Sequence, residues 1–109
     1  MPDREIDITR NVRTIEWLKC EILTDISNLY RLLSDGAKDE LYEDLTETSA
    51  NIILLTYLLS RRLGLSYSAL QNMINSKIKL GLVENHDIEK YYGDLTELSK
   101  HFNKPGKQP

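Results

Sequence analysis

The sequence has few residues that break helices and few that fill the strands of β proteins. Among 109 residues there are three prolines, five glycines and one phenylalanine, whereas leucine, isoleucine, glutamate and lysine are abundant. Proline and glycine are costly inside helices, and aromatic residues are enriched in strands. The composition therefore predicts an all-α protein.

Cysteine is nearly absent, because Cys20 is the only one in the chain. A single cysteine cannot form an internal disulfide, and the two histidines lie too far from it in sequence for Cys/His zinc spacing. Nothing near Cys20 marks it as a nucleophile, so we interpret it as an inert helix residue. The composition fits a reducing compartment, and we expect the protein to be cytoplasmic.

Long apolar runs are also missing. The longest extends from Ile52 to Leu59 and includes Thr56, which is much shorter than the roughly 20 residues of a membrane-spanning helix. Residues 1–5 are largely charged and lack the apolar core of a secretory signal. We therefore expect neither export nor contact with a membrane.

The chain also has no excess of positively charged residues. The formal net charge is −3, and the basic residues are scattered except for the pair Arg61 and Arg62. Proteins that bind duplex DNA or RNA carry a basic patch that neutralises phosphates. The sequence therefore argues against a nucleic acid polymer as the partner.

Two long stretches carry apolar residues at the spacing of amphipathic helices. The first is predicted to run from Asp7 or Thr9 to about Leu33, and the second covers about residues 38–63 from a start at Lys38 or Asp39. Their short connection predicts antiparallel neighbours. The predicted inward stripe of the first helix consists of Ile8, Val12, Ile15, Leu18, Ile22, Ile26, Leu29 and Leu33.

The second long helix is apolar on every side beyond Asn51, which predicts that it is buried on all sides. Two further elements follow. One is predicted from a cap at Ser66 to an end at Gly81, and the other is predicted to start from a cap at Asn85 and to be interrupted at Gly93. Together these elements predict a bundle of four to five helices in which the two long antiparallel helices form the core.

The length of the chain predicts one domain, which we place at residues 1–102, followed by a flexible polar tail at residues 103–109. A domain of this size buries a modest core, and pairing with a second copy hides more apolar surface. We therefore expect a homodimer with the two long helices at the interface.

Oxygen-bearing side chains gather where the second long helix enters the core. Antiparallel packing places Glu21 and Asp25 at about the level of Glu47, Thr48 and Asn51. Magnesium takes oxygen ligands and binds one or two carboxylates together with substrate phosphates. These residues are candidate ligands. In the alternative interpretation the glutamates are solvated, Asp25 pairs with a lysine or hydroxyl, and Asn51 forms a hydrogen bond across the bundle.

Four segments resemble the MazG-like family, and the resemblance extends over about residues 8–100. The segments are IEWLKCEILTD at 15–25, ANIILLTYLLSRRLGLSY at 50–67, KIKLG at 77–81 and EKYYGDL at 89–95. This family is similar to the all-α nucleoside triphosphate pyrophosphohydrolases. The resemblance implies magnesium-dependent cleavage of a nucleoside triphosphate to a monophosphate and pyrophosphate, in a helical bundle that dimerisation completes.

Those enzymes hold magnesium with an ExxE pair on one helix and an ExxD pair on the next. The resemblance implies catalytic roles for Glu21 and Glu47 and a metal site of Glu21, Asp25, Glu47 and Asn51. The match is partial, because Asn51 replaces the expected aspartate and Thr48 the expected glutamate of ExxD. On the first helix, Thr24 occupies the second acid position of ExxE.

The resemblance also implies that Lys77 contacts the phosphates, whereas Gly81 stands where an asparagine is expected. In the alternative interpretation Lys77 is a cation in the last turn of its helix, where it interacts favourably with the helix dipole. Because two expected acids are replaced, a second hypothesis is that the chain is a catalytically inactive helical dimer that acts as an interaction or regulatory module.

Overall fold

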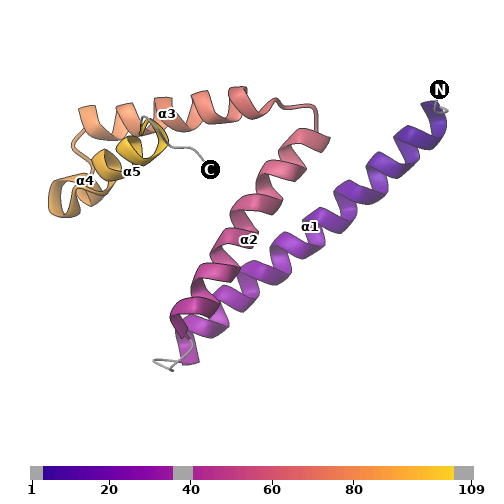
Figure 1. Ribbon diagram of the computed structural model, residues 1–109, viewed down its shortest axis with the longest axis horizontal. Helices are drawn as coiled ribbons and strands as arrows, with labels where there is room; N and C mark the ends of the chain where they lie inside the picture. Colours follow the sequence, from indigo (N-terminus) through magenta and orange to yellow (C-terminus); the bar gives the residue numbers. More distant parts are fainter. Residues whose placement is uncertain (1–3, 36–40, 105–109) are drawn as a thin grey trace. The chain divides into compact units, whose positions relative to one another are not determined.

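The structure is a computed structural model that describes residues 4–35 and 41–104. Within these ranges it contains five helices and no strand: α1 (Arg4–Asp35), α2 (Leu41–Arg62), α3 (Tyr67–Val83), α4 (Asp87–Tyr92) and α5 (Asp94–Phe102) (Figure 1). The predicted all-α fold is confirmed. None of these helices combines the length and the apolar character that a membrane crossing requires.

The chain divides into two compact units, residues 1–67 and residues 68–109. In the first unit, α1 and α2 lie side by side and run antiparallel (Figure 1), which confirms the predicted pair and forms a helical hairpin. The predicted start of the second helix at Lys38 or Asp39 lies outside the described residues. The single domain over residues 1–102 stays a prediction. So does the tail, of which only Asn103 and Lys104 are described.

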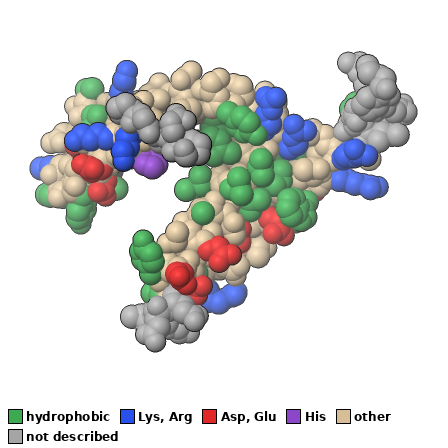
Figure 2. Space-filling view, in the orientation of Figure 1, with side chains coloured by type: hydrophobic (Ala, Val, Ile, Leu, Met, Phe, Trp, Pro, Cys, Tyr) green, Lys and Arg blue, Asp and Glu red, His purple; other side chains and the backbone are tan. Residues whose placement is uncertain are grey.

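The hairpin has a thin core. Leu18 is 2% exposed and is the only fully buried side chain among the described residues of the hairpin, whereas Ile53 and Leu54 are 59% and 54% exposed. The expectation that α2 is buried on all sides is therefore wrong for one chain, because a single neighbouring helix covers a single face. Figure 2 shows apolar side chains over the C-terminal half of α2 and acidic side chains nearer its N-terminal half.

The face of α1 that packs against α2 is rotated from the predicted stripe. Ile8, Val12, Ile26 and Leu33 are exposed. The half-buried side chains of α1 are instead Asn11, Thr14, Ile15, Glu21, Ile22, Asp25, Asn28, Leu29 and Leu32. Because consecutive residues are about 100° apart, this rotation brings polar side chains into the seam between the helices. It also leaves an uncovered apolar flank on α1.

Polar contacts close the end of the hairpin that lies away from the connection between its helices. Asn11 donates from Nδ2 to the backbone oxygen of Arg62 at 3.1 Å, and Arg62 donates from Nη1 to Oδ1 of Asn11 at 3.2 Å. The ring of Tyr67 lies 6.3 Å from that of Tyr57 and 5.7 Å from the guanidinium of Arg61. Asn11 thus satisfies one of the carbonyls that the end of α2 leaves without a helical partner.

The second unit is built on α3, and Ile78, 5% exposed, is the buried side chain among its described residues. The helix continues past Gly81 to Val83, so the predicted end at Gly81 is wrong. A Cβ placed on Gly81 would lie 2.6 Å from Cδ1 of Leu95 in α5. This glycine therefore marks the place where α5 packs closely against α3.

Short-range contacts define α4 and its junction with α5. Nδ1 of His86 accepts a hydrogen bond from the backbone of α4 at 3.1 Å, so His86 and not Asn85 caps this helix. Gly93 separates the two helices with a φ of 70°, as its predicted interruption requires. The carboxylate of Glu89 accepts hydrogen bonds from the hydroxyl of Thr96 at 2.6 Å and its N–H at 3.0 Å, and these lower the pKa of Glu89.

Candidate functional site

Three of the four predicted metal ligands lie along the seam of the hairpin. Glu21, Asp25 and Asn51 are half-buried between α1 and α2, and Glu47 is exposed on α2. The rotation of α1 explains this placement, because the face it turns toward α2 contains Glu21 and Asp25 next to Leu18 and Ile22. The seam of this hairpin is therefore partly polar.

These four side chains take part in no hydrogen bond or ion pair within residues 4–35 and 41–104. The alternative interpretation paired Asp25 with a lysine or hydroxyl and gave Asn51 a hydrogen bond across the bundle. Neither contact is present in the described part of the chain. Within the described residues no side-chain oxygen or nitrogen is both buried and without a hydrogen-bond partner, so water reaches the polar atoms of these half-buried groups.

A complete metal site is not present in the described residues, since no group of three or more histidine, cysteine, aspartate or glutamate side chains is placed to hold an ion. Magnesium does not require such a group, because it keeps several waters and binds one or two carboxylates together with phosphates. Asp25 and Glu21, one helical turn apart, offer oxygen donors of the right kind. These residues are compatible with magnesium, and their assignment as ligands stays a prediction.

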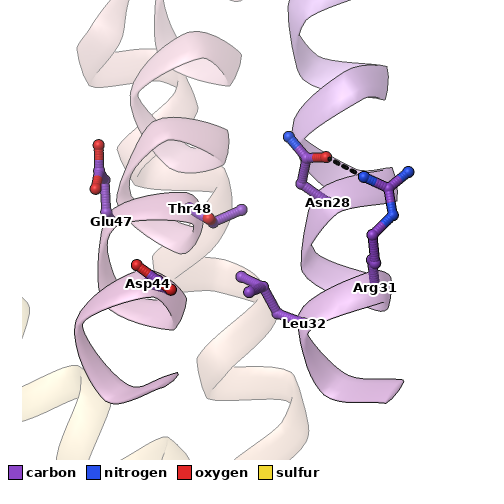
Figure 3. A pocket seen from close by; sticks show the side chains of 6 residues that line it. All are labelled: Asn28, Arg31, Leu32, Asp44, Glu47 and Thr48. Atoms are coloured by element: carbon purple, nitrogen blue, oxygen red, sulfur yellow. Dashed lines mark hydrogen bonds between the residues drawn. The ribbon is translucent and has the colours of Figure 1, made fainter. Parts of the chain in front are cut away.

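A pocket opens between α1 and α2 beside these residues (Figure 3). Its volume is about 240 Å³, and it is lined by Asn28, Arg31, Leu32, Asp44, Glu47 and Thr48, which we call the inter-helix pocket. In Figure 3, Leu32 and Thr48 extend toward the opposite helix, and the guanidinium of Arg31 lies within hydrogen-bond distance, 3.3 Å, of Oδ1 of Asn28. Of the predicted site residues, only Glu47 lines this pocket.

Lys77 belongs to the second unit and is exposed on α3 beside the buried Ile78. Because α3 extends to Val83, its last turn contains no basic residue, and the interpretation of Lys77 as a last-turn cation is wrong. Its predicted role in binding phosphate stays a prediction. Cys20 is an exposed free thiol on α1.

Sequence reasoning missed Asn28, Arg31 and Asp44. For two of them, the spacing from a predicted site residue could have indicated that they lie near the site. Asn28 follows Glu21 by two helical turns and therefore lies on the same flank of α1, and Asp44 precedes Glu47 by about one turn. Arg31 gave no such signal, because an arginine near a helix end is usually solvated.

The fold and the polar seam together define an all-α protein built on a helical hairpin with oxygen donors between its helices. The chain belongs to the MazG-like family, whose model matches residues 8–95. The match begins in α1 and ends in α5, so it includes both units. Comparisons with curated proteins and with solved structures found no significant match.

Proposed function

We propose that this protein is a magnesium-dependent nucleotide-binding protein of the nucleoside triphosphate pyrophosphohydrolase type. The observation that carries the proposal is the set of half-buried oxygen donors at the seam, Glu21, Asp25 and Asn51, which have no hydrogen-bond partner within residues 4–35 and 41–104. Membership of the MazG-like family over residues 8–95 supports the same chemistry.

Each residue has a role in this proposal. Glu21, Asp25 and Glu47 bind the metal through their carboxylates, and Asn51 contributes its amide oxygen or orients a bound water. Glu21 and Glu47 are the catalytic pair. In the reaction, a water oxygen bonds to the α-phosphorus of the triphosphate as the bond to pyrophosphate breaks. The products are a nucleoside monophosphate and pyrophosphate.

Bound magnesium would supply two effects, a lower pKa for its water and compensation of the charge on the phosphates. The chain itself supplies the carboxylates, of which Glu21 and Asp25 are half-buried and Glu47 is exposed, and opposite charges interact more strongly at lower dielectric. Asp25 follows Ile22 by three residues and precedes Leu29 by four, so it lies on the same face of α1 as these two half-buried apolar residues.

The decisive assay incubates the purified full chain with magnesium and a panel of canonical and modified nucleoside triphosphates and measures released pyrophosphate. Asp25→Asn is expected to reduce turnover at least tenfold. The matched control is Glu16→Gln on the same helix, which loses only an exposed contact with Lys19 and is expected to keep full activity. Absence of both turnover and magnesium-dependent nucleotide binding would refute the proposal.

We also propose that the protein is a homodimer. The exposed apolar side chains of the hairpin, among them Leu23, Ile53 and Leu54, support this, because soluble monomers rarely leave such surfaces uncovered. Multi-angle light scattering is expected to give twice the mass of one chain. Ile53→Glu and Leu54→Glu test two flanks of α2 separately, since neighbouring helix positions differ by about 100°. Glu43→Ala, exposed on the same helix, is the control. A monomer at every concentration would contradict the proposal.

A second function has its own support. Thr48 and Asn51 stand where the family resemblance places acids. The replacement of these two acids favours a chain that keeps the helical dimer without the chemistry and acts as an interaction module. Restoring the acids with Thr48→Glu and Asn51→Asp distinguishes the two functions. Turnover that appears only in this double variant would identify the natural chain as inactive.

A further inference from the structure

The short helix α4 exposes its apolar face. Tyr91 and Tyr92 follow Ile88 by three and four residues, so the three side chains lie on one face of the helix. Ile88 is 41% exposed, Tyr91 67% and Tyr92 75%, and apolar side chains are visible on the surface of α4 in Figure 2. The half-buried residue of α4 is instead the acidic Glu89. An ordinary surface helix has the reverse arrangement, with its apolar face buried and its charged residues exposed.

Polar contacts hold α4 in this orientation. At its N-terminus, Nδ1 of His86 accepts a hydrogen bond from the N–H of Ile88 at 3.1 Å. The carboxylate of Glu89 accepts two hydrogen bonds from Thr96 in the first turn of α5. Gly93 has no side chain that could cap α5, so Glu89 takes the place of a capping side chain. Hydrogen bonds therefore fix the inward side of α4 and keep its apolar face at the surface.

The segment around α4 carries the net negative charge of the chain. Of the 17 acidic and 14 basic residues, four acidic residues and one lysine lie within residues 84–94, so the rest of the chain has 13 of each sign. The four acidic residues are Glu84, Asp87, Glu89 and Asp94. None of them takes part in an ion pair with another described residue. The apolar face therefore lies in a negative field, which attracts a cationic partner and repels an acidic one.

The two tyrosines offer a contact that suits a cationic partner. The face of a tyrosine ring attracts the cation of a lysine or an arginine. Nζ of Lys90 lies 5.4 Å from the centre of the Tyr91 ring, which is one contact of this kind within the protein. The ring of Tyr92 has no cation or ring contact within residues 4–35 and 41–104. Tyr92 is therefore available for a cation that a partner supplies.

We propose that the exposed face of α4 is a docking surface for a cationic segment of a partner protein. Ile88 and Tyr91 contact apolar atoms of this segment, and the ring of Tyr92 contacts a lysine or an arginine. Asp87, which directly precedes Ile88, pairs with a second positive charge. A second copy that docks through the same face fits less well, because two acidic faces repel each other. This surface lies on α4 and does not depend on nucleotide chemistry at the seam.

The first test selects short peptides from a random display library on the immobilised full chain. Counter-selection on the double variant Tyr91→Ala, Tyr92→Ala removes peptides that bind elsewhere, and it leaves the charge of the selected peptides open. These peptides are expected to combine lysine or arginine with apolar residues. Selection of acidic or uncharged peptides, or of no peptide at all, would overturn the inference.

Fluorescence anisotropy then measures the affinity of one selected peptide for variants of the full chain. Asp87→Asn is expected to weaken binding roughly twofold to fivefold, as the loss of one exposed ion pair does, and added salt should weaken binding to wild type. The matched controls on α2 are Glu43→Gln for the charge and Tyr42→Ala for the ring, since both residues are exposed. Both should bind as wild type does. The same affinity for Asp87→Asn and Glu43→Gln would contradict the proposed ion pair and the inference with it.

Two further measurements test whether anything else covers the face. Tyr92→Ala should leave the urea midpoint of the free protein unchanged, because Tyr92 is exposed. A lower midpoint would mean that the chain itself covers the ring, and the inference would fail. Light scattering should give wild type and Tyr92→Ala the same mass. A lower mass for the variant would identify a second copy as the occupant of the face and would also refute the inference.

Discussion

Replacing Gly81 with alanine tests the close packing of α3 against α5. Within a helix, alanine is more favourable than glycine by about 1 kcal/mol. The added methyl group would lie 2.6 Å from Cδ1 of Leu95, and carbon atoms pack best at about 3.5–4.0 Å. Relieving this overlap requires a displacement of about 1 Å, and overpacking of this kind costs about 1–3 kcal/mol. Gly81→Ala is therefore expected to leave stability unchanged or to lower it by up to about 2 kcal/mol.

The effect of Gly81→Ala on stability should become favourable when the side chain of Leu95 is shortened. In a Leu95→Ala background the nearest remaining neighbour of the new methyl group is Cβ of His86 at 4.0 Å, an ordinary contact. Gly81→Ala should then stabilise the protein by about 1 kcal/mol through helix propensity alone. The double-mutant cycle therefore predicts a coupling of about 1–3 kcal/mol between the two positions.

Urea unfolding followed by far-UV circular dichroism measures the four free energies of this cycle. Ser76→Ala, at an exposed position of the same helix, reports the gain from helix propensity where no neighbour interferes. If Gly81→Ala stabilises the protein by the same amount in both backgrounds, α5 does not pack against Gly81 and the argument is refuted.

Three further predictions follow from the packing of each unit. Leu18→Ala should destabilise the hairpin by about 2–5 kcal/mol, because Leu18 is the buried residue among the described part of the hairpin. Leu23→Ala in dilute protein should change stability by less than about 0.5 kcal/mol, because Leu23 is exposed. Urea unfolding followed by Trp17 fluorescence compares the free energies of unfolding of the two variants. Glu89→Gln should lower stability at neutral pH. The stability that Glu89 contributes is present above its unfolded pKa of about 4.5 and is lost as the pH falls through its lower native pKa, so the difference between wild type and Glu89→Gln should fade in acid, and a constant difference would contradict this. Gly93→Ala should cost about 1 kcal/mol, because a side chain is strained at a φ of 70°, and Gly93→Asn should recover part of this loss in thermal unfolding.

Local signals were sufficient for the order of the helices, since caps, breaks and apolar spacing act over a few residues. They were not sufficient at Gly81, because a glycine that ends a helix and a glycine that admits a neighbouring helix look alike in sequence. Only the position of Leu95, fourteen residues later, distinguishes them. The interruption at Gly93 was predictable because its left-handed φ is a local requirement.

The spacing of apolar residues in the sequence could not predict the rotation of α1. Apolar residues spread over a wide sector of this helix, and Leu18 and Leu29 belong both to the predicted stripe and to the observed face. Which side of that sector meets α2 depends on the fit of the two surfaces, so the exposure of Ile26 could not be read from spacing. The sequence predicted only part of the candidate site. Glu47 was predicted, but the pocket that Glu47 and Arg31 both line could be recognised only when α1 and α2 were placed together.

The hydrogen bonds between Asn11 and Arg62 have a consequence for the dynamics of the hairpin. They join positions 51 residues apart and are exposed, and bonds of this kind contribute about 1 kcal/mol each. The end of the hairpin that they close can therefore separate by local unfolding while the contacts around Leu18 persist. Amide hydrogen exchange should be fast in the first turns of α1 and the last turn of α2 and slower toward Leu18. The rate of this opening sets how often that end of the seam is exposed to solvent.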